Sequence, residues 1–365
     1  MSILAEYWDR FQSSLFPRLE TALEEPLTEK LQQFVRVLDI VRIEQFVASP
    51  HLQWMGRKAL DRRAMARAFI AKALYDFTTT ELLIETLQLQ PTLRRLCGFE
   101  DRNSIPSAST FSRAFAQFAA SNLGDRVHEA LVKSYVGDKV VMHVSRDATE
   151  VVAREKPAKK EKRAKKAARK VGRPKKGEAP PPPDPTRLQK QLGQTAQEAL
   201  SELPTVCDVG SKKDSKGNLH HWIGWKSHID WADGGIPLNM VTTSASLHDS
   251  QVAIPMARIT ASRAISFYDL MDAAYDAGPI RQVSEELGHV PIIDINPRGG
   301  EPKPMEPYRA LRYNERSTAE RGNSRLKDAF GFRHLRVRGH PKAHLHLMFG
   351  ILALFADQLY KVFSG

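Results

Sequence analysis

The stretch YNERSTAERGNSRLKDAFG, residues 313–331, has the composition of a helix and places four reactive side chains on one side of it. They are Tyr313, Arg316, Glu320 and Lys327. At 100° per residue they fall within an arc of roughly 60°, along about 21 Å of helix. This stripe combines a carboxylate that could bind a cation with basic groups that could bind phosphate. Mixed charge is also usual on a solvated helix face, so spacing alone leaves both interpretations open.

The same helix carries a separate apolar face, about 100° away, formed by Ala319, Leu326 and Phe330. We expect this face to pack on a sheet and the polar stripe to lie beside it.

Carboxylates also follow the predicted strands. DKVVMHVSRDATEVV holds an apolar run that predicts a strand ending before Asp147, and AISFYDLMD predicts a second strand ending at Asp272. The ends of buried strands are where α/β folds place ligand sites, although a single Asp there is often only a helix cap. Asp249 fits the capping role, whereas Asp269 and Asp276 stay open as ligands. Two such carboxylates and a third from a helix would suit Mg²⁺ or Mn²⁺.

The order of elements around these acids predicts a mixed α/β layer. HHWIGWKSHIDW alternates like a strand, GGIPLNMVTTSA follows as its partner, and Gly234-Gly235 supplies the turn. A helix from about Asp249, the strand AISFYDLMD, a helix over 278–287 and the strand HVPIIDI come next. With the strand before Asp147, this order predicts a sheet flanked by helices.

Residues 1–134 are predicted to form a separate helical domain. No strand pattern interrupts them, and Phe111, Phe115 and Phe118 fall at i, i+4 and i+7, an apolar stripe typical of a buried helix face.

The net charge of +12 is concentrated in one segment of the 365-residue chain. Residues 154–190 hold fifteen Lys and Arg and four acids, which gives +11 and leaves the rest near neutral. Their Lys density and four consecutive prolines predict a disordered insert over 154–203. Within it, VGRPKK resembles a minor-groove hook: Arg173 is the central residue of a Gly-Arg-Pro step, and Lys175 and Lys176 follow it. Such a hook would fit an A·T-rich minor groove, whereas non-specific phosphate binding needs only the charge.

Other features limit the class of protein. Cys97 and Cys207 are far apart and have no partners at metal-ligand spacing, which argues against a disulfide scaffold and suits a reducing compartment. No signal peptide is recognisable at the N-terminus, and the longest apolar run, LMFGILALFA, is too short to span a bilayer. We therefore expect a cytoplasmic protein with a buried helix at 347–356.

The order Tyr-x2-Arg-x3-Glu-x6-Lys resembles the signature of the insertion-sequence DDE transposases. SRDATEVVAREKP and YDLMDAAYD resemble the blocks of that family that hold the first and second catalytic Asp, here Asp147 and Asp272. WIGWKSHIDWADGGIPLNMVTTSASLHDSQVAIP, GHVPIIDINPR and FRHLRVRGHPKAHLHLMFGILAL are also similar to its blocks. The resemblance runs from about residue 138 to the end, apart from the basic insert, and the helical N-terminus is similar to the N-terminal region of such transposases.

The resemblance implies a ribonuclease-H-like catalytic domain over 135–365, with residues 1–134 binding DNA ends or mediating assembly. Asp147, Asp272 and Glu320 would hold two Mg²⁺ ions, which Mn²⁺ could replace, and the site would cut transposon ends and join them to target DNA.

The resemblance also implies DNA contacts. Arg316 and Lys327 would bind phosphates beside the scissile bond, and Tyr313 would contact phosphate or stack on a base. Lys226, on the same side of its strand as His228, is a further candidate. The partners would be terminal inverted repeats and target DNA, bound by a homodimer or larger assembly associated with the bacterial nucleoid.

Two alternatives remain at this stage: a ribonuclease-H-like nuclease without strand transfer, and an inactive DNA-binding protein derived from a transposase. The intact acids favour an enzyme. A zinc site at His340, His344 and His346 is disfavoured, because on a helix His344 and His346 point roughly 160° apart.

Overall fold

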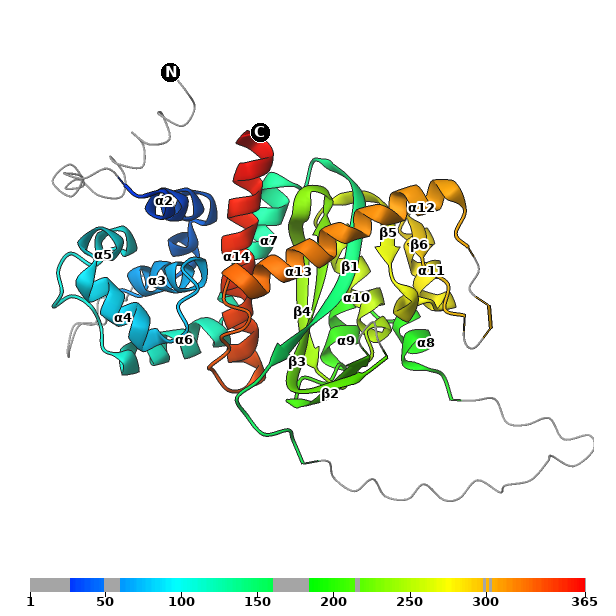
Figure 1. The fold of residues 1–365 in the computed structure, drawn as a ribbon, viewed down its shortest axis with the longest axis horizontal. Helices are drawn as coiled ribbons and strands as arrows, with labels where there is room; N and C mark the ends of the chain where they lie inside the picture. Colours follow the sequence, from blue (N-terminus) through cyan, green and yellow to red (C-terminus); the bar gives the residue numbers. More distant parts are fainter. Residues whose placement is uncertain are drawn as a thin grey trace, which may run out of the picture.

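The computed structural model describes residues 27–48, 60–159, 184–213, 217–297, 300–301 and 304–364. In Figure 1 a group of N-terminal helices lies on one side, the sheet with its covering helices lies on the other, and the long C-terminal helix stands between them.

The N-terminal part is helical, as predicted. Its elements are α2 (Glu29–Val41), η2 (Ile43–Phe46), α3 (Arg63–Leu74), α4 (Thr80–Leu89), α5 (Pro91–Cys97), α6 (Ala108–Ala120) and α7 (Leu123–Tyr135). Side-chain caps fix several starts: Thr28 accepts from the backbone of Leu31 before α2, and Thr79 from that of Leu82 before α4. The predicted stripe of Phe111, Phe115 and Phe118 is buried.

The C-terminal helix α14 (His340–Ser364) joins the helices to the sheet. It packs against α2, α3, α6, α7 and β4 (Ile236–Ser244), and one hydrophobic cluster runs through all of them. Phe69 of α3 stacks on Phe349 of α14 with ring centroids 5.4 Å apart. The N-terminal helices therefore share their hydrophobic core with the last helix of the chain, a contact that the sequence does not predict.

α14 is long and apolar enough to cross a membrane by length and composition, but 72% of its most apolar window is buried inside the protein. Leu347, Ile351 and Phe355 are fully covered. The prediction of a buried core helix at this position is confirmed.

The sheet has six strands in the order β2-β3-β1-β5-β6, with β4 also paired to β3. They are β1 (Val140–Val152), β2 (Asp208–Lys213), β3 (Leu219–Ala232), β4 (Ile236–Ser244), β5 (Ile265–Met271) and β6 (Val290–Ile293). β1 is antiparallel to β3 and parallel to β5, and β5 is parallel to β6. This mixed sheet is the predicted ribonuclease-H-like arrangement, and positive φ angles at Gly234 (74°) and Gly235 (76°) make the predicted turn between β3 and β4.

Helices cover the sheet. They are α8 (Arg187–Leu192), α9 (Ala196–Ser201), α10 (Ser250–Ala261), α11 (Gly278–Glu286), α12 (Pro307–Tyr313) and α13 (Ser317–Ala329), with the short turns η3 (Asp233–Gly235), η4 (Ala273–Tyr275) and η5 (Asn314–Arg316). In Figure 1, α12 and α13 run as one long rod across the sheet. The stretch predicted as one helix therefore contains the end of α12, the 3-10 turn η5 and α13.

The structure differs from the predicted elements in three details. β1 does not end before Asp147 but continues to Val152, because residues 144–152 pair with β3. β2 was not predicted. The insert predicted as disordered over 154–203 contains two ordered helices, α8 and α9. Each begins with a capping box, at Thr186 for α8 and at Thr195 for α9.

The C-terminal end of α8 is hydrogen-bonded to α10. Gln191 donates to the carbonyl of Gln251 at 2.9 Å, and the guanidinium of Arg258 donates to the carbonyl of Leu192 at 3.0 Å. Polar composition concealed these helices, since their stability comes from caps and from side-chain contacts with α10 rather than from a core of their own.

α13 docks closely on the sheet. Ala319 and Leu326 are fully buried, and Phe330 is 3% exposed, as predicted for this apolar face. Gly322 lies against the indole of Trp231 in β3, where a Cβ atom would come within 2.6 Å of the ring carbons. The missing side chain at Gly322 therefore sets how closely α13 approaches the strands that carry the acids.

Candidate active site

The three candidate acids come from three separate elements. Asp147 lies in the middle of β1, Asp272 follows β5 immediately, and Glu320 is in the first turn of α13. β1 and β5 are adjacent parallel strands, which brings Asp147 and Asp272 to the same region of the sheet. The side chain of Asp272 caps η4 by accepting from the backbone of Ala274 at 2.9 Å, which fixes its orientation.

Arg316 connects all three carboxylates. Its Nη2 lies 3.4 Å from Asp147 Oδ1 and 3.4 Å from Asp272 Oδ2, and its Nη1 donates to Glu320 Oε1 at 2.9 Å. Because two carboxylates contact the same nitrogen, the guanidinium occupies the space between them. The structure thus brings together four of the predicted side chains in one cluster.

Asn323 is a site residue that the sequence interpretation missed. Its side-chain amide donates to Asp147 Oδ2 at 2.9 Å, and it is 6% exposed. A signal was present: Asn323 stands seven positions after Arg316, so it falls about 20° from it on the helix wheel. The stripe is recognisable by its charged side chains, and an uncharged amide does not stand out among them.

Burial raises the pKa of Asp147 to about 6, with Arg316 acting to lower it and Asp272 to raise it. A buried carboxylate near a second carboxylate gains from a cation, because the cation offsets both the lost hydration and the mutual repulsion. Asp147 therefore sits where a positive partner is needed.

A buried ion pair supports β1 from below. Arg146, the neighbour of Asp147, points to the opposite face and donates from Nε to Asp230 Oδ1 at 2.7 Å and from Nη2 to Oδ2 at 2.9 Å. Thr260 of α10 donates to the same carboxylate at 2.6 Å. Arg146 and Asp230 are 1% and 0% exposed, so this pair ties β1, β3 and α10 together beneath Asp147.

The remaining residues of the stripe flank the acids. Tyr313 ends α12, and burial raises its pKa to about 12, so it is a neutral phenol at pH 7. Lys327 Nζ lies 3.7 Å from Glu150 Oε1 at the far end of α13, with 24% of its side chain exposed. Its ammonium is therefore partly open to solvent beside the cluster.

Lys226 does not fit the predicted DNA contact. Its Nζ donates to the carbonyl of Leu247 and to Asp249 Oδ1, both at 2.9 Å, and its side chain is only 14% exposed. The lysine instead joins β3 to the turn before α10. Asp249 stands at the N-cap position of α10 but makes no capping bond, because its carboxylate pairs with Lys226.

His228, on the same strand, is fully buried and shares a 2.9 Å hydrogen bond with Thr243 Oγ1. Burial lowers its pKa to about 4, so it is a neutral core residue.

The other acids that were left open as ligands have other partners. Asp269 contacts Ser284 Oγ and lies 3.2 Å from His289 Nδ1. Asp276 accepts from Arg281 Nη2 at 2.8 Å. Neither carboxylate faces Arg316, which leaves Asp147, Asp272 and Glu320 as the acids of this cluster.

The histidines near the C-terminus contact different groups. His344 lies between Thr242 Oγ1 and Asp125 Oδ1, each at 2.9 Å, and His346 bonds the carbonyl of Gly331 at 2.9 Å. His340 bonds the carbonyl of Thr242 at 2.8 Å. Each histidine joins α14 to a neighbouring segment.

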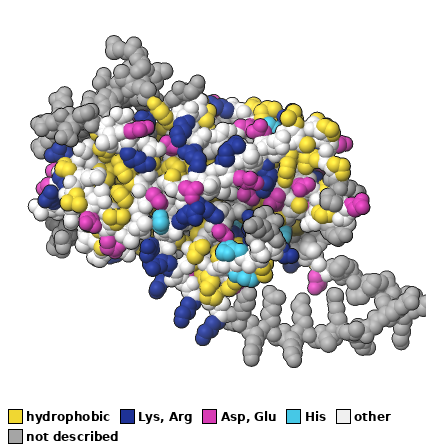
Figure 2. Space-filling view, in the orientation of Figure 1, with side chains coloured by type: hydrophobic (Ala, Val, Ile, Leu, Met, Phe, Trp, Pro, Cys, Tyr) yellow, Lys and Arg dark blue, Asp and Glu magenta, His cyan; other side chains and the backbone are white. Residues whose placement is uncertain are grey.

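The predicted DNA-binding residues Arg173, Lys175 and Lys176 lie outside the described residues. Lys156 and Lys159, the last described lysines before that segment, are exposed, and Figure 2 shows basic side chains that project from the lower edge of the molecule. On the face crossed by α13 the same view shows basic and acidic side chains interspersed.

The carboxylate cluster suits a divalent cation in its chemistry. Asp147, Asp272 and Glu320 offer oxygen donors, which hard cations prefer, and a guanidinium already lies among them. Within the described residues no three His, Cys, Asp or Glu side chains are arranged closely enough to hold a metal ion. Arg316 accounts for this spacing, because the carboxylates are arranged around its guanidinium.

The fold is a ribonuclease-H-like domain with one carboxylate on β1, one just after the parallel strand β5 and one on the helix that crosses them. Comparison with protein families agrees. Residues 20–117 match a transposase domain (DUF772), and residues 195–356 match a transposase DDE domain. No curated protein and no solved structure matches the chain.

The chain therefore belongs to the insertion-sequence DDE transposases. It is a DNA transposase, an enzyme of a family that depends on divalent metal ions and acts on DNA.

Proposed function

We propose that Asp147, Asp272 and Glu320 are the metal-binding acids of this transposase and that Mg²⁺ is its ion, with Mn²⁺ able to substitute. The observation that carries the proposal is the convergence of all three carboxylates on the guanidinium of Arg316. Two bound ions would activate the attacking oxygen and stabilise the leaving 3′-oxygen during phosphoryl transfer.

The surrounding residues prepare this site. Asn323 holds one oxygen of Asp147 and leaves the other facing Arg316 and Asp272. Once cations bind the carboxylates, Arg316 is free to contact the phosphate that reacts, with a fork of donors suited to phosphate oxygens. Lys327 contacts a phosphate farther along α13, and the neutral Tyr313 contacts phosphate or stacks on a base.

The DNA partners are the terminal inverted repeats of a transposon and a target duplex. Two ends must be held in one complex to be joined, so the active species is a homodimer or a larger assembly on DNA. The N-terminal helices contribute to end binding or assembly. The enzyme works in the bacterial cytoplasm, associated with the nucleoid.

The basic insert, including Arg173, Lys175 and Lys176, adds a contact with the DNA backbone or an A·T-rich minor groove. Deletion of residues 158–183 removes nine net positive charges and should make DNA affinity much less dependent on salt. An unchanged slope of affinity against salt concentration would refute this role.

Strand transfer of a pre-cleaved oligonucleotide end, in Mg²⁺ or Mn²⁺, tests the assignment of the acids. Glu320→Gln keeps the side-chain shape and removes the charge, so joining should be lost while DNA binding persists. Glu315→Gln is the matched control, since Glu315 is exposed one turn earlier and contacts none of the three carboxylates. If the Glu320→Gln protein joins DNA as well as the unaltered protein does, Glu320 is not one of the metal-binding acids. DNA cleavage without joining by the unaltered enzyme would favour a nuclease.

A further inference from the structure

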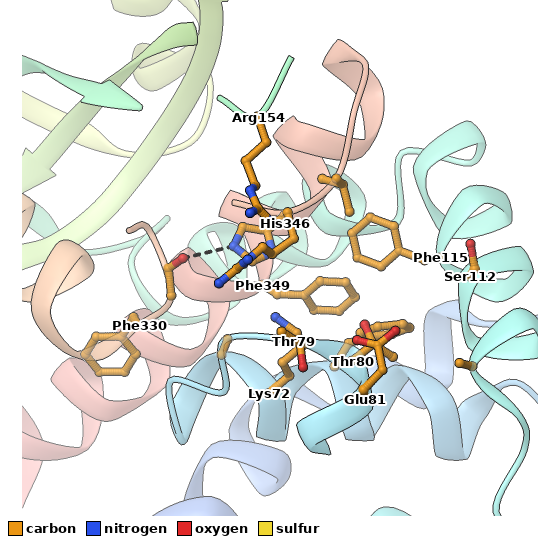
Figure 3. Close-up of a pocket in the computed structure, with 16 residues that line it drawn as sticks. Lys72, Thr79, Thr80, Glu81, Ser112, Phe115, Arg154, Phe330, His346 and Phe349 are labelled. Carbon is orange, nitrogen blue, oxygen red and sulfur yellow. Dashed lines mark hydrogen bonds between the residues drawn. The ribbon is translucent and has the colours of Figure 1, made fainter. Parts of the chain in front are cut away.

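A cavity separate from the carboxylates lies where the N-terminal helices meet the end of α13. Its volume is about 320 Å³. Figure 3 shows it between α3, α4 and α6 on one side and α14 with the loop after α13 on the other. The segment that follows β1 also reaches it through Arg154.

Lys72 is the unusual residue of this cavity. It is 91% buried on α3, points into the cavity in Figure 3, and its side chain makes no hydrogen bond or ion pair with any described residue. Burial lowers its pKa to about 8, so it still carries its charge at pH 7. The carboxylates of Asp76 and Glu81 act on this ammonium only at longer range than an ion pair. An anion in the cavity would supply the direct hydrogen-bonded partner that it lacks.

Two more cations line the same cavity. Arg154 and Arg336 are exposed, and neither side chain is hydrogen-bonded or ion-paired within the described part of the chain. The N-terminus of α4, which begins at Thr80, adds the positive end of a helix dipole. Glu81 is the acid of the lining that opposes them, and Asp76, which does not line the cavity, also acts on Lys72. Three cations, one acid and a helix N-terminus leave a net positive cavity.

The residues at the floor of the cavity strengthen the attraction of this positive charge for an anion. Phe69, Phe115 and Phe349 are each at least 93% buried and pack on one another, with Phe69 and Phe115 ring centroids 4.9 Å apart. His346 also lines it, and burial lowers the pKa of this imidazole to about 3, so it stays neutral. Apolar and neutral walls reduce the screening of Lys72, which makes the attraction for an anion stronger than on an open surface.

Both elements that carry the carboxylates lead to this cavity. Phe330 of its lining follows Glu320 by ten residues of α13, about 15 Å of helix. Arg154 follows Asp147 by seven residues, about 23 Å of extended chain. At about 3.4 Å per base pair, these distances correspond to roughly four to seven base pairs of a duplex that starts at the carboxylates.

We infer that this cavity binds a backbone phosphate of the transposon end, about four to seven base pairs from the reacting phosphate, with Lys72 as the buried contact. This inference rests on the proposed function and adds a second fixed point for the DNA. A duplex held at the carboxylates and at this cavity has its position along α13 set at both ends.

The test is a methylphosphonate scan, which neutralises one phosphate at a time in a duplex carrying the terminal sequence. Binding is measured by fluorescence anisotropy in EDTA, so that cleavage plays no part. For the unaltered protein, one or two substitutions four to seven base pairs from the end should weaken binding about tenfold. Lys72→Met, which keeps the length and loses the charge, should bind the normal duplex about tenfold more weakly and be insensitive to those substitutions.

Two further variants sharpen the result. Glu81→Gln removes the opposing charge and should tighten binding two- to threefold. Lys133→Met is the matched control, since it makes the same change at an exposed site on α7 paired with Glu129, and should leave the scan unaltered. If the Lys72→Met protein does not fold, the scan on the unaltered protein and the affinity of Glu81→Gln still test whether the cavity binds a DNA phosphate.

A Lys72→Met protein with normal affinity and an unchanged scan would overturn the inference. So would binding of free inorganic phosphate that depends on Lys72 while the scan shows no sensitive position, because the anion would then not come from DNA. A protein that does not bind terminal sequences at all would instead contradict the proposed function. If the protein cleaves and joins DNA but no phosphate four to seven base pairs from the end affects binding, the inference about the cavity is wrong and the proposed function stands.

Discussion

The buried pair beneath Asp147 makes a demanding prediction about stability. In Asp230→Asn, the amide oxygen can still accept one of the two bonds from Arg146, at Nε or Nη2, but the negative charge is gone. The guanidinium, 1% exposed, then loses its hydrogen-bonded counter-charge and keeps only the more distant carboxylate of Asp269. Removing one partner of a buried ion pair costs about 3–5 kcal/mol. Because one hydrogen bond survives and Thr260 can still contact the amide, we expect the lower end, about 3 kcal/mol of unfolding free energy.

Urea unfolding followed by tryptophan fluorescence measures this cost, since Trp231 lies next to Asp230 on β3. Asp39→Asn is the control, because Asp39 forms a 3.6 Å surface pair with Arg42 and should change stability by less than about 1 kcal/mol. The double variant Arg146→Met with Asp230→Leu should be more stable than Asp230→Asn, since it leaves no unpaired charge. A loss below about 1 kcal/mol for Asp230→Asn would refute the assignment of a charge buried away from water.

Two further predictions concern acid stability and helix docking. Burial lowers the pKa of His128 to about 3, so between pH 3 and 6.5 the unfolded chain binds a proton that the folded protein does not, and stability falls as pH falls. In His128→Gln the amide can still donate to the carbonyl of Pro237. The slope of unfolding free energy against pH, measured by urea titrations, should fall by up to about 1.4 kcal/mol per pH unit, and an unchanged slope contradicts the assignment of a neutral buried His128. Gly322→Ala gains about 1 kcal/mol of helix propensity but forces α13 away from Trp231, so strand transfer should fall more than stability; full activity would show that the docking distance is not critical.

The strands and the acids could be predicted because their signals are local. Alternation in β3 and the apolar runs around Asp147 and Asp272 follow from periodicity, and their order along the chain limits the possible sheets. β2 escaped prediction because DVGSKK is short and three of its six residues are Lys or Ser at exposed positions. It is held by pairing with β3, which a single stretch of sequence does not reveal.

The site was only partly predictable for the same reason. Helical spacing placed Arg316 and Glu320 on one face, but no spacing within α13 shows that Asp147 lies 3.4 Å from Arg316, since 169 residues separate them. Lys226 looked available on its strand, and only the folded chain shows that Asp249 holds it. The shared core of α14 and the N-terminal helices is likewise a long-range contact, made by apolar faces that each predict burial without naming the partner.

The guanidinium among the carboxylates leads to a last prediction. Arg316 lies in the space that bound cations would take, so it competes with them for Asp147 and Asp272. We therefore expect Arg316→Ala to bind Mn²⁺ severalfold more tightly, measured by electron paramagnetic resonance, and yet to lose strand transfer because the phosphate contact is gone.

The pH of that measurement matters. The pKa of Asp147 is about 6, and Arg316 acts to lower it, so removing the arginine raises it further. At pH 8 the carboxylate should be ionised in both proteins, which separates competition from protonation. Arg321→Ala is the control, because Arg321 donates to Ser317 Oγ at 2.8 Å on the same helix and contacts none of the three acids. If Arg316→Ala binds Mn²⁺ more weakly at pH 8, the guanidinium orients the carboxylates for the metal and does not compete with it.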